Sequence, residues 1–191
     1  MGHIYDKDFV QGELPMTKQE IRAISIGKLL LEPESILIDV GAGTGTIGIE
    51  GATYLRHGKV YAIEKEVKGI ETLKKNIDRF ALENIEIVVG RAPEAIPEIS
   101  YDRMFIGGST GSMRSILEHF NKYSKKNSRI VINAITLETI GEATKLLKEL
   151  NFQDIEVVNV SVARGKKVGP YTMMYGENPI YIISANKGEN Q

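Results

Sequence analysis

The stretch that decides the fold is SILIDVGAGTGTIGIE, residues 35–50. Its first six residues form a short β-branched apolar run, which is typical of a buried strand. The glycine-rich GAGTG follows directly, and the segment from Gly45 to about Arg56 is expected to be a helix. Missing side chains in such a turn let a ligand approach the backbone amides at the start of a helix. The stretch therefore predicts a nucleotide-cofactor turn.

The spacing within the turn indicates which cofactor it serves. The glycines follow G-x-G-x-G rather than the dinucleotide pattern G-x-G-x-x-G, and Asp39 lies just before the first of them. Both details favour S-adenosylmethionine over NAD. The residues expected to form the cofactor turn are Gly41, Ala42, Gly43, Thr44 and Gly45.

Two later positions support a cofactor site. Glu64 ends the next predicted strand, where an acidic side chain accepts hydrogen bonds from ribose hydroxyls in such folds. The loop after the third predicted strand would pass over the adenine edge, with Ala92 as the contact. A lone glycine turn is often only a tight connection, and an acidic strand end is often only solvated. Their agreement favours cofactor binding over that alternative.

Outward from the turn, strand and helix patterns alternate, which predicts βαβ units and a parallel sheet. A first helix, residues 17–31, is expected to begin with a capping box of Thr17 and Glu20. Further strands are expected at residues 35–40, 59–64, 85–89, 101–106 and 128–135, and further helices at about 67–80, 112–123 and 137–150.

The end of the chain breaks this alternation. Residues 154–164 and 179–185 are strand-like with no helix between them, so they should pair antiparallel. The connection, residues 165–178, is too long for a tight hairpin and is expected to be a basic loop. The predicted fold is α/β: a class I S-adenosylmethionine-dependent methyltransferase (Rossmann-like) with a seven-stranded, mostly parallel sheet and an antiparallel C-terminal strand pair.

We expect one domain over residues 1–191. Its parts are an N-terminal segment and helix (1–33), a cofactor-binding α/β core (34–151) and the C-terminal strand pair with the basic loop (152–187).

Composition excludes several function classes. The chain has no cysteine, which rules out disulfides, thiolate metal sites and cysteine nucleophiles. Its net charge of -1 disfavours nucleic acid as a partner. No apolar stretch approaches the roughly 20 residues that span a bilayer, and no signal peptide is evident, so we expect a cytoplasmic protein without a membrane partner. The three histidines lack metal-ligand spacing, so no metal site is assigned.

Four stretches carry a resemblance to a known family: ELPMTKQEIR (13–22), DVGAGTGTIGIE (39–50), GRAPEAI with FIGGS (90–96 and 105–109), and RIVINAITLE (129–138). Over nearly its full length the sequence resembles the precorrin-6Y and cobalt-precorrin-6B C15-methyltransferase (decarboxylating) family of cobalamin biosynthesis. The glycine turn is common to many methyltransferases, whereas PMTK-x-EIR and FIGGS are more specific.

The resemblance implies methyl transfer from S-adenosylmethionine to C15 of a precorrin or cobalt-precorrin, coupled to loss of carbon dioxide from the C12 acetate. The family's cofactor site, carried onto this sequence, comprises Thr17, the turn from Gly41 to Gly45, Glu64 and Ala92. Thr17 is then a cofactor contact, a helix cap or both. The resemblance also implies a homotetramer and a separate C5-methyltransferase acting in the same pathway.

A tetrapyrrole acceptor carries many carboxylates, so its site should present cations. The candidates are Arg164, Lys166 and Lys167 in the predicted loop and Arg114 near residues 107–111, although charged loops are often only solvated. Asn133 ends the fifth predicted strand and is either an acceptor contact or a satisfied turn residue. No catalytic residue is assigned. Tyr171, Met173, Met174 and Tyr175 are expected to cover the macrocycle or to pack between subunits.

Three other functions compete with this interpretation. The nearest is a methyltransferase of the same fold acting on RNA or protein, although the near-zero net charge and the lack of an N-P-P-Y-type motif count against nucleic acid. A non-catalytic regulator would bind the cofactor without turnover. An oxidoreductase would bind a nicotinamide cofactor instead.

Overall fold

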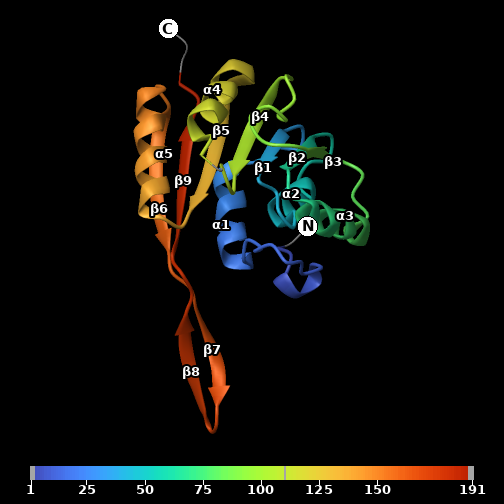
Figure 1. Ribbon diagram of the computed structural model, residues 1–191, viewed down its shortest axis with the longest axis vertical. Coiled ribbons are helices and arrows are strands. Elements are labelled where there is room, and N and C mark those ends of the chain that lie inside the picture. Colours follow the sequence, from blue (N-terminus) through green and yellow to red (C-terminus); the bar gives the residue numbers. More distant parts are fainter. Residues whose placement is uncertain (1–2, 110, 189–191) are drawn as a thin grey trace.

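A seven-stranded sheet forms the centre of the computed structural model, which describes residues 3–109 and 111–188. Its strand order is β3-β2-β1-β4-β5-β9-β6, and β9 alone runs antiparallel to its neighbours (Figure 1). The predicted mostly parallel sheet is therefore confirmed, including the antiparallel pairing of its last two strands in the sequence. The strands are β1 (Ile36–Val40), β2 (Lys59–Glu64), β3 (Ile85–Val89), β4 (Tyr101–Ile106), β5 (Ser124–Ala134), β6 (Gln153–Val160) and β9 (Ile180–Asn186).

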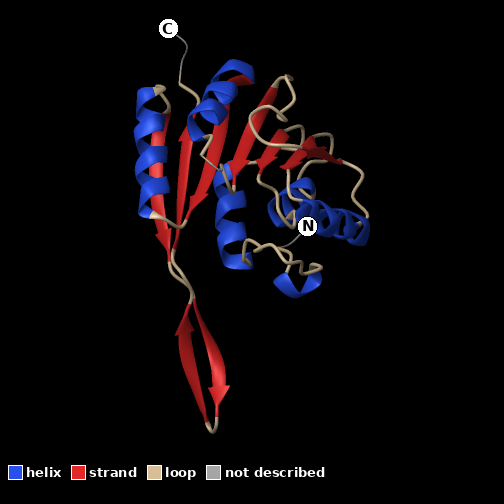
Figure 2. Cartoon of the chain, viewed as in Figure 1, coloured by secondary structure: helices blue, strands red, loops and turns tan. Residues whose placement is uncertain are grey.

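Helices cover both faces of this sheet and make a three-layer arrangement (Figure 2). One face packs against α1 (Gln19–Leu29), α2 (Thr46–Ala52) and α3 (Val67–Phe80), and the other against α4 (Met113–Tyr123) and α5 (Leu137–Glu149). A short 3-10 helix, η1 (Asp6–Asp8), precedes them. No helix among the described residues is long and apolar enough to cross a membrane.

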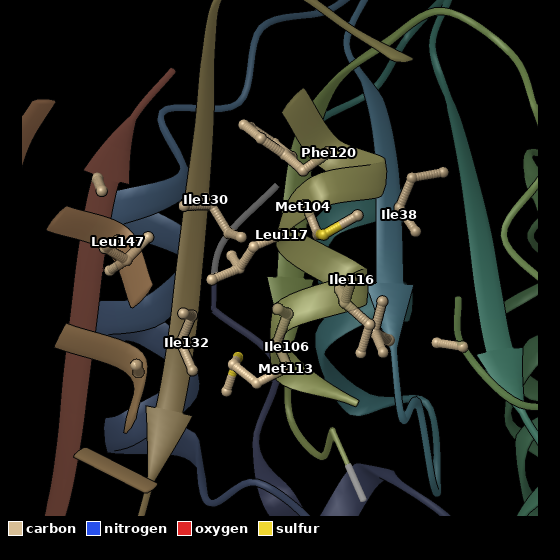
Figure 3. Close-up of a cluster of buried hydrophobic side chains, with 14 of the residues drawn as sticks. Ile38, Met104, Ile106, Met113, Ile116, Leu117, Phe120, Ile130, Ile132 and Leu147 are labelled. Carbon is tan, nitrogen blue, oxygen red and sulfur yellow. The ribbon is translucent and has the colours of Figure 1, made fainter. Parts of the chain in front are cut away.

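The larger apolar core lies between the sheet and the pair α4 and α5. Met113, Ile116, Leu117 and Phe120 recur at helical spacing on α4 and are at most 1% exposed. Figure 3 shows them directed at β1, β4 and β5, where they meet side chains such as Met104. Since helices also cover the opposite face, the central strands are apolar on both sides, as parallel sheets require.

The segment before α1, residues 3–18, which we call the N-terminal strap, is fixed to the body by one buried arginine. The Arg22 side chain is fully buried and donates to the Glu50 carboxylate at 2.6 Å and to Asp6 at 3.0 Å. It also donates to the carbonyl oxygens of Ile4 at 2.5 Å and Thr17 at 2.6 Å. Arg22 therefore holds both ends of the strap.

The predicted start of α1 is wrong. Lys18, not Thr17, is the N-cap residue, and no side chain caps the helix, which runs from Gln19 to Leu29 rather than over residues 17–31. The capping box fails because the Glu20 carboxylate, instead of turning back to the backbone, pairs with Arg164 at 2.7 Å. The helix ends early because Leu30 adopts the left-handed conformation, with φ of 51°.

The basic loop predicted at residues 165–178 is also wrong. It is a hairpin of β7 (Ala163–Val168) and β8 (Tyr171–Gly176), a separate two-stranded sheet that extends far from the body (Figure 1). Gly169, with φ of 60°, and Pro170 form a two-residue turn between the strands. At the base, the Glu177 amide donates to the Val162 carbonyl at 2.8 Å. We call residues 162–177 the hairpin arm.

The hairpin arm has no core of its own. Every residue of β8 is exposed, including Tyr171 at 72% and Met174 at 66%. The Lys166 ammonium lies 5.3 Å from the centre of the Tyr175 ring, one of the arm's own side-chain contacts. The arm therefore presents its apolar side chains outward.

Candidate cofactor and acceptor site

Two adjoining cavities, of about 490 and 500 Å³, open at the carboxyl ends of the parallel strands. Both are lined by Pro15, Gly41, Gly43, Gly107 and Ile135, so they meet at the glycine turn. We call the first the strap cavity, because the N-terminal strap and the base of the hairpin arm form its outer wall. We call the second the Glu64 cavity, after the residue at the end of β2. Ligands of open α/β sheets bind at this edge.

The three glycines of the turn have different tasks. All have positive φ, of 72° at Gly41, 55° at Gly43 and 82° at Gly45. A Cβ on Gly41 would lie 3.0 Å from the Gly108 backbone, and one on Gly45 would lie 2.1 Å from Leu73 Cδ1. A Cβ on Gly43 would have no protein atom closer than 3.8 Å. Gly41 and Gly45 are thus required for packing, whereas Gly43 leaves open space on the cavity side.

Glu64 joins the turn to β2. Its carboxylate, in a residue 6% exposed, accepts from the Gly43 amide at 2.7 Å through Oε2. Oε1 accepts from the amides of Lys65 and Glu66, each at 2.8 Å. A carboxylate offers about four lone-pair sites, so it can also accept from a ligand in the Glu64 cavity. Glu64 therefore both fixes the turn and faces the predicted ribose position.

Asp39, which precedes the glycine turn, is a site residue for which no contact was predicted. It is 1% exposed and lines the strap cavity. Its Oδ2 accepts from the Gly48 amide at 2.9 Å, whereas Oδ1 has no hydrogen-bond partner among the described residues. Burial, reinforced by the nearby negative charge of Glu64, raises the pKa of the Asp39 carboxyl to about 7. Such a buried oxygen is normally paired, so a hydrogen-bond donor from a ligand or from an ordered water would satisfy Oδ1.

The structure gathers most of the predicted cofactor residues at these cavities. Thr17, Ala42 and Thr44 line the strap cavity together with Gly41 and Gly43. Ala92 and Glu64 line the Glu64 cavity. Gly45 lines neither cavity, because it packs beneath the turn against Leu73.

Asn133, predicted at the acceptor edge, lines the strap cavity. Its side-chain amide lies 3.1 Å from Ser25 Oγ, which fixes the side-chain orientation. The single hydroxyl hydrogen of Ser25 also has the Ile21 carbonyl as an acceptor, at 2.9 Å. The contact with Ser25 occupies one end of the Asn133 amide, so the other end is available to a ligand.

The predicted cations do not line either cavity. Arg114 lies on α4 and pairs with Glu149. Lys166 and Lys167 lie on β7, which carries them away from the body instead of folding back over the site. Arg164 lies at the base of the arm, where it donates to Glu177 at 2.6 Å and to Glu20 at 2.7 Å. This contact lowers the pKa of Glu20 to about 2.

Other lining residues were missed as well. All three line the strap cavity: Lys18 lies on the strap, Glu177 is the last residue of the hairpin arm, and Asn178 follows it. Lys18 lies within the PMTK stretch, which carries the family resemblance, so its position in the sequence could have indicated a site residue. Glu177 and Asn178 carried none, because their place depends on a hairpin that the sequence did not predict. No group of three or more metal-ligating side chains occurs within residues 3–109 and 111–188.

The strand order with an antiparallel β9, the glycine turn after β1 and the acidic end of β2 together define the class I methyltransferase fold. Residues 8–187 match the family model described as the precorrin methyltransferase domain. The chain belongs to this family.

Relatives match over nearly their full length. A protein of Saccharolobus solfataricus named "Probable cobalt-precorrin-6B C(15)-methyltransferase (decarboxylating)" is 38% identical over 92% of this chain and 90% of its own. The crystal structure of a precorrin-6Y C5,15-methyltransferase from Geobacter metallireducens has a TM-score of 0.88 and 33% identity, covering 96% of this chain and 97% of that one. A precorrin-8W decarboxylase from Methanobacterium thermoautotrophicum has the same TM-score and identity, covering 95% and 98%.

Proposed function

We propose that this chain transfers a methyl group from S-adenosylmethionine to C15 of a precorrin or cobalt-precorrin and releases the C12 acetate carboxyl as carbon dioxide, in cobalamin biosynthesis. The observation that carries the proposal is the family match over residues 8–187, supported by relatives of the same length with this activity in their names. The chain would act as a single domain.

The cavities suit S-adenosylmethionine, which supplies an electrophilic methyl group when it is bound. Glu64 would accept from the ribose hydroxyls, and Ala92 would contact the adenine edge. The open space at Gly43 leaves room for the cofactor to approach the turn. The unpaired Oδ1 of Asp39 suits a cationic donor such as the cofactor's ammonium group. These residues span both cavities and would fix the cofactor across the glycine turn.

The chain's contribution to methyl transfer would be alignment. A meso carbon of a reduced tetrapyrrole is itself nucleophilic, so a covalent enzyme nucleophile is unnecessary, and holding the reacting atoms in line supplies much of the rate. The Asn133 amide, fixed by Ser25, is placed to hydrogen-bond an acceptor group. Phe105, Ile135 and Val162 add apolar surface to the strap cavity and would exclude water from the acceptor.

The decarboxylation requires a destination for electrons, which the macrocycle itself provides. The bond between the acetate methylene and its carboxyl breaks, its electron pair enters the conjugated ring system, and the methylene carbon gains a proton. The chain would assist by keeping the departing carboxylate free of tight cationic partners. A strong ion pair stabilises the carboxylate of the ground state more than the transition state. A site without a strong ion pair to this carboxylate therefore allows faster loss of carbon dioxide.

We also infer a homotetramer and a separate C5-methyltransferase as pathway partner. The support for assembly is the hairpin arm, whose exposed Tyr171, Met173, Met174 and Tyr175 form an apolar surface on a hairpin without a core. They do not line either cavity, which favours subunit packing over covering of the macrocycle within one protomer. Light scattering of the purified chain tests the assembly, and a monomer would reject it.

The activity is tested by anaerobic incubation with S-adenosylmethionine and a C1-methylated, ring-contracted precorrin, with and without cobalt, while product mass is followed. Gain of one methylene and loss of one carbon dioxide is the expected result. Gain of the methylene alone would remove decarboxylation from this chain. Cofactor binding without any mass change would point to a different acceptor.

A further inference from the structure

The strap cavity has one cation among its lining residues, all of which are described: Lys18. The residue is exposed and immediately precedes α1. Within the described chain its ammonium group makes no hydrogen bond and no ion pair, unlike the guanidinium groups of Arg22 and Arg164. Lys18 is therefore available to a ligand.

The acidic groups near Lys18 are bonded to another cation. Glu177 lines the same cavity, and an unpaired carboxylate there would repel an anionic ligand. The Arg164 guanidinium lies 2.6 Å from Glu177 and 2.7 Å from Glu20, so its single positive charge is shared by two carboxylates and the three groups keep a net charge of -1. Neither carboxylate forms an ion pair with Lys18, so its ammonium group remains available to a carboxylate of a ligand.

The depth of Lys18 distinguishes it from the cofactor residues. Asp39, Thr44 and Thr46 form the floor of the cavity and are 1–2% exposed. Lys18 lines the same cavity but is exposed, so it lies at the rim. A ligand held there lies above the cofactor position, where the edge of the acceptor would enter.

We propose that Lys18 anchors a carboxylate side chain of the tetrapyrrole acceptor; this rests on the proposed function and names a specificity residue for it. The anchored group is one that the product retains. An ammonium bound to the departing carboxylate would stabilise the ground state and slow carbon dioxide loss, whereas a bond to a retained carboxylate orients the ring at no such cost. Replacing Lys18 should therefore raise the KM for the acceptor and leave kcat nearly unchanged.

The test is a titration that does not depend on turnover. The intact protein, saturated with S-adenosylhomocysteine, is titrated with cobyrinic acid, a stable corrin whose side chains end in carboxylates, and binding is followed by visible absorbance. The fully esterified methyl ester of cobyrinic acid serves as the uncharged probe. Lys18→Gln is compared with the wild type, with Lys18→Arg as the charge-keeping variant and with Lys166→Gln as the matched control on the hairpin arm.

We expect Lys18→Gln to weaken cobyrinic acid binding by roughly tenfold or more, while its binding of the ester and of S-adenosylhomocysteine stays at wild-type values. Lys18→Arg should restore most of the affinity, and Lys166→Gln should match the wild type. The proposal is wrong if Lys18→Gln binds cobyrinic acid as tightly as the wild type does. It is also wrong if the substitution weakens binding of the ester as much as binding of cobyrinic acid. Weakened S-adenosylhomocysteine binding would reassign Lys18 to the cofactor's carboxylate. If the wild type binds S-adenosylhomocysteine but neither corrin, the proposed acceptor class itself fails, and the anchor fails with it.

Discussion

The cavity floor and the hairpin arm are stabilised in opposite ways. At the floor, polar groups are buried and fixed by short hydrogen bonds to backbone amides, as with Asp39 to Gly48 and Glu64 to Gly43. In the arm, Tyr171 and Met174 are exposed, and the two strands pair only with each other, with Arg164 at the base contacting Glu20 of α1. An isolated two-stranded hairpin is marginal in water. The floor is therefore stabilised within one protomer, whereas a protein surface that covers the arm would stabilise it, as the proposed assembly requires.

This contrast assigns cofactor binding and subunit assembly to different parts of the chain. Cofactor binding should respond to changes at the floor and at the strap that covers it, and assembly should respond to changes in the arm.

The largest effect is expected from the arginine that fixes the strap. Arg22→Met leaves the buried Glu50 carboxylate without its guanidinium partner, with only the contact to His3 at 2.9 Å remaining, and breaking a buried pair in this way costs about 3–5 kcal/mol. Chemical denaturation should show this loss in the free energy of unfolding. The control is Lys59→Met, which removes an ion pair with Glu86 on the surface and should change stability far less. Equal losses of unfolding free energy in the two variants would contradict the role of Arg22 in fixing the strap.

Gly43→Val should abolish cofactor binding, and it should also cost some stability, because a β-branched residue is strained at the φ of 55° that Gly43 adopts. The added side chain meets open space on the protein side and occupies the cavity instead, so affinity should fall by roughly 100-fold or more, or nearly 3 kcal/mol. Calorimetric titration with S-adenosylhomocysteine measures this. Gly45→Val is the comparison, because its Cβ collides with Leu73 and should impair folding itself. Wild-type affinity of Gly43→Val would place the cofactor elsewhere.

Glu64→Ala should weaken cofactor binding without abolishing it. Each charge-assisted hydrogen bond lost to the ribose costs on the order of 1.5–3 kcal/mol, and the Gly43 amide also loses its partner. Glu64→Gln keeps an acceptor oxygen, so its affinity for S-adenosylhomocysteine should lie between those of Glu64→Ala and the wild type in the same titration. Unchanged affinity in both variants would remove Glu64 from the cofactor site.

Cofactor affinity should also depend on pH through Asp39. Its carboxyl has a pKa of about 7, so it is largely protonated below that pH and must lose the proton to pair with the cofactor's ammonium. Affinity should therefore rise between pH 6 and pH 8, with a slope approaching roughly tenfold per pH unit below the pKa. Asp39→Asn should flatten this profile. Titrations in buffers of different ionisation enthalpy should detect proton release at pH 6, and its absence would disprove the pairing.

The smallest effect on the cavity is expected from the arm. Tyr171→Lys with Met174→Glu should dissociate the assembly, because the change replaces exposed apolar surface with charge. Surface substitutions of this kind change a remote site by no more than about 0.5 kcal/mol, so affinity for S-adenosylhomocysteine should stay within about twofold of wild type. Light scattering and calorimetry on the same sample measure both quantities. A large fall in affinity would mean that the arm is part of the cofactor site.

The parts of the molecule that the sequence predicted are those dictated by local signals. The run from residue 35 to 50 contains its own strand, turn and helix start, and residues 41–45 lie where that pattern puts them. Glu64 was predicted as a cofactor residue because it ends a strand. In each case, neighbours within a few residues determine the geometry, so no long-range contact had to be anticipated.

The errors come from contacts between distant residues. Thr17 and Glu20 match a capping box, but Arg164, far along the chain, takes the Glu20 carboxylate. The arm was predicted as a loop because its sequence is rich in Gly, Lys and Tyr. The Gly169-Pro170 turn between aligned strands was the signal for a hairpin. Because this turn was not recognised, Lys166 and Lys167 were wrongly predicted at the acceptor site. For the same reason, Glu177 was not predicted to line the strap cavity.

The closed base of the arm has a consequence for how such proteins can diversify. Beneath the arm, β6 and β9 are already paired up to Val160 and Ile180, and the Glu177 amide meets the Val162 carbonyl across the base. The arm is thus an insertion into a finished sheet edge. It can lengthen, shorten or change its surface without shifting the register of any strand that carries the active site. The part of the arm between Val162 and Glu177 can therefore vary without replacing any residue that lines the strap cavity.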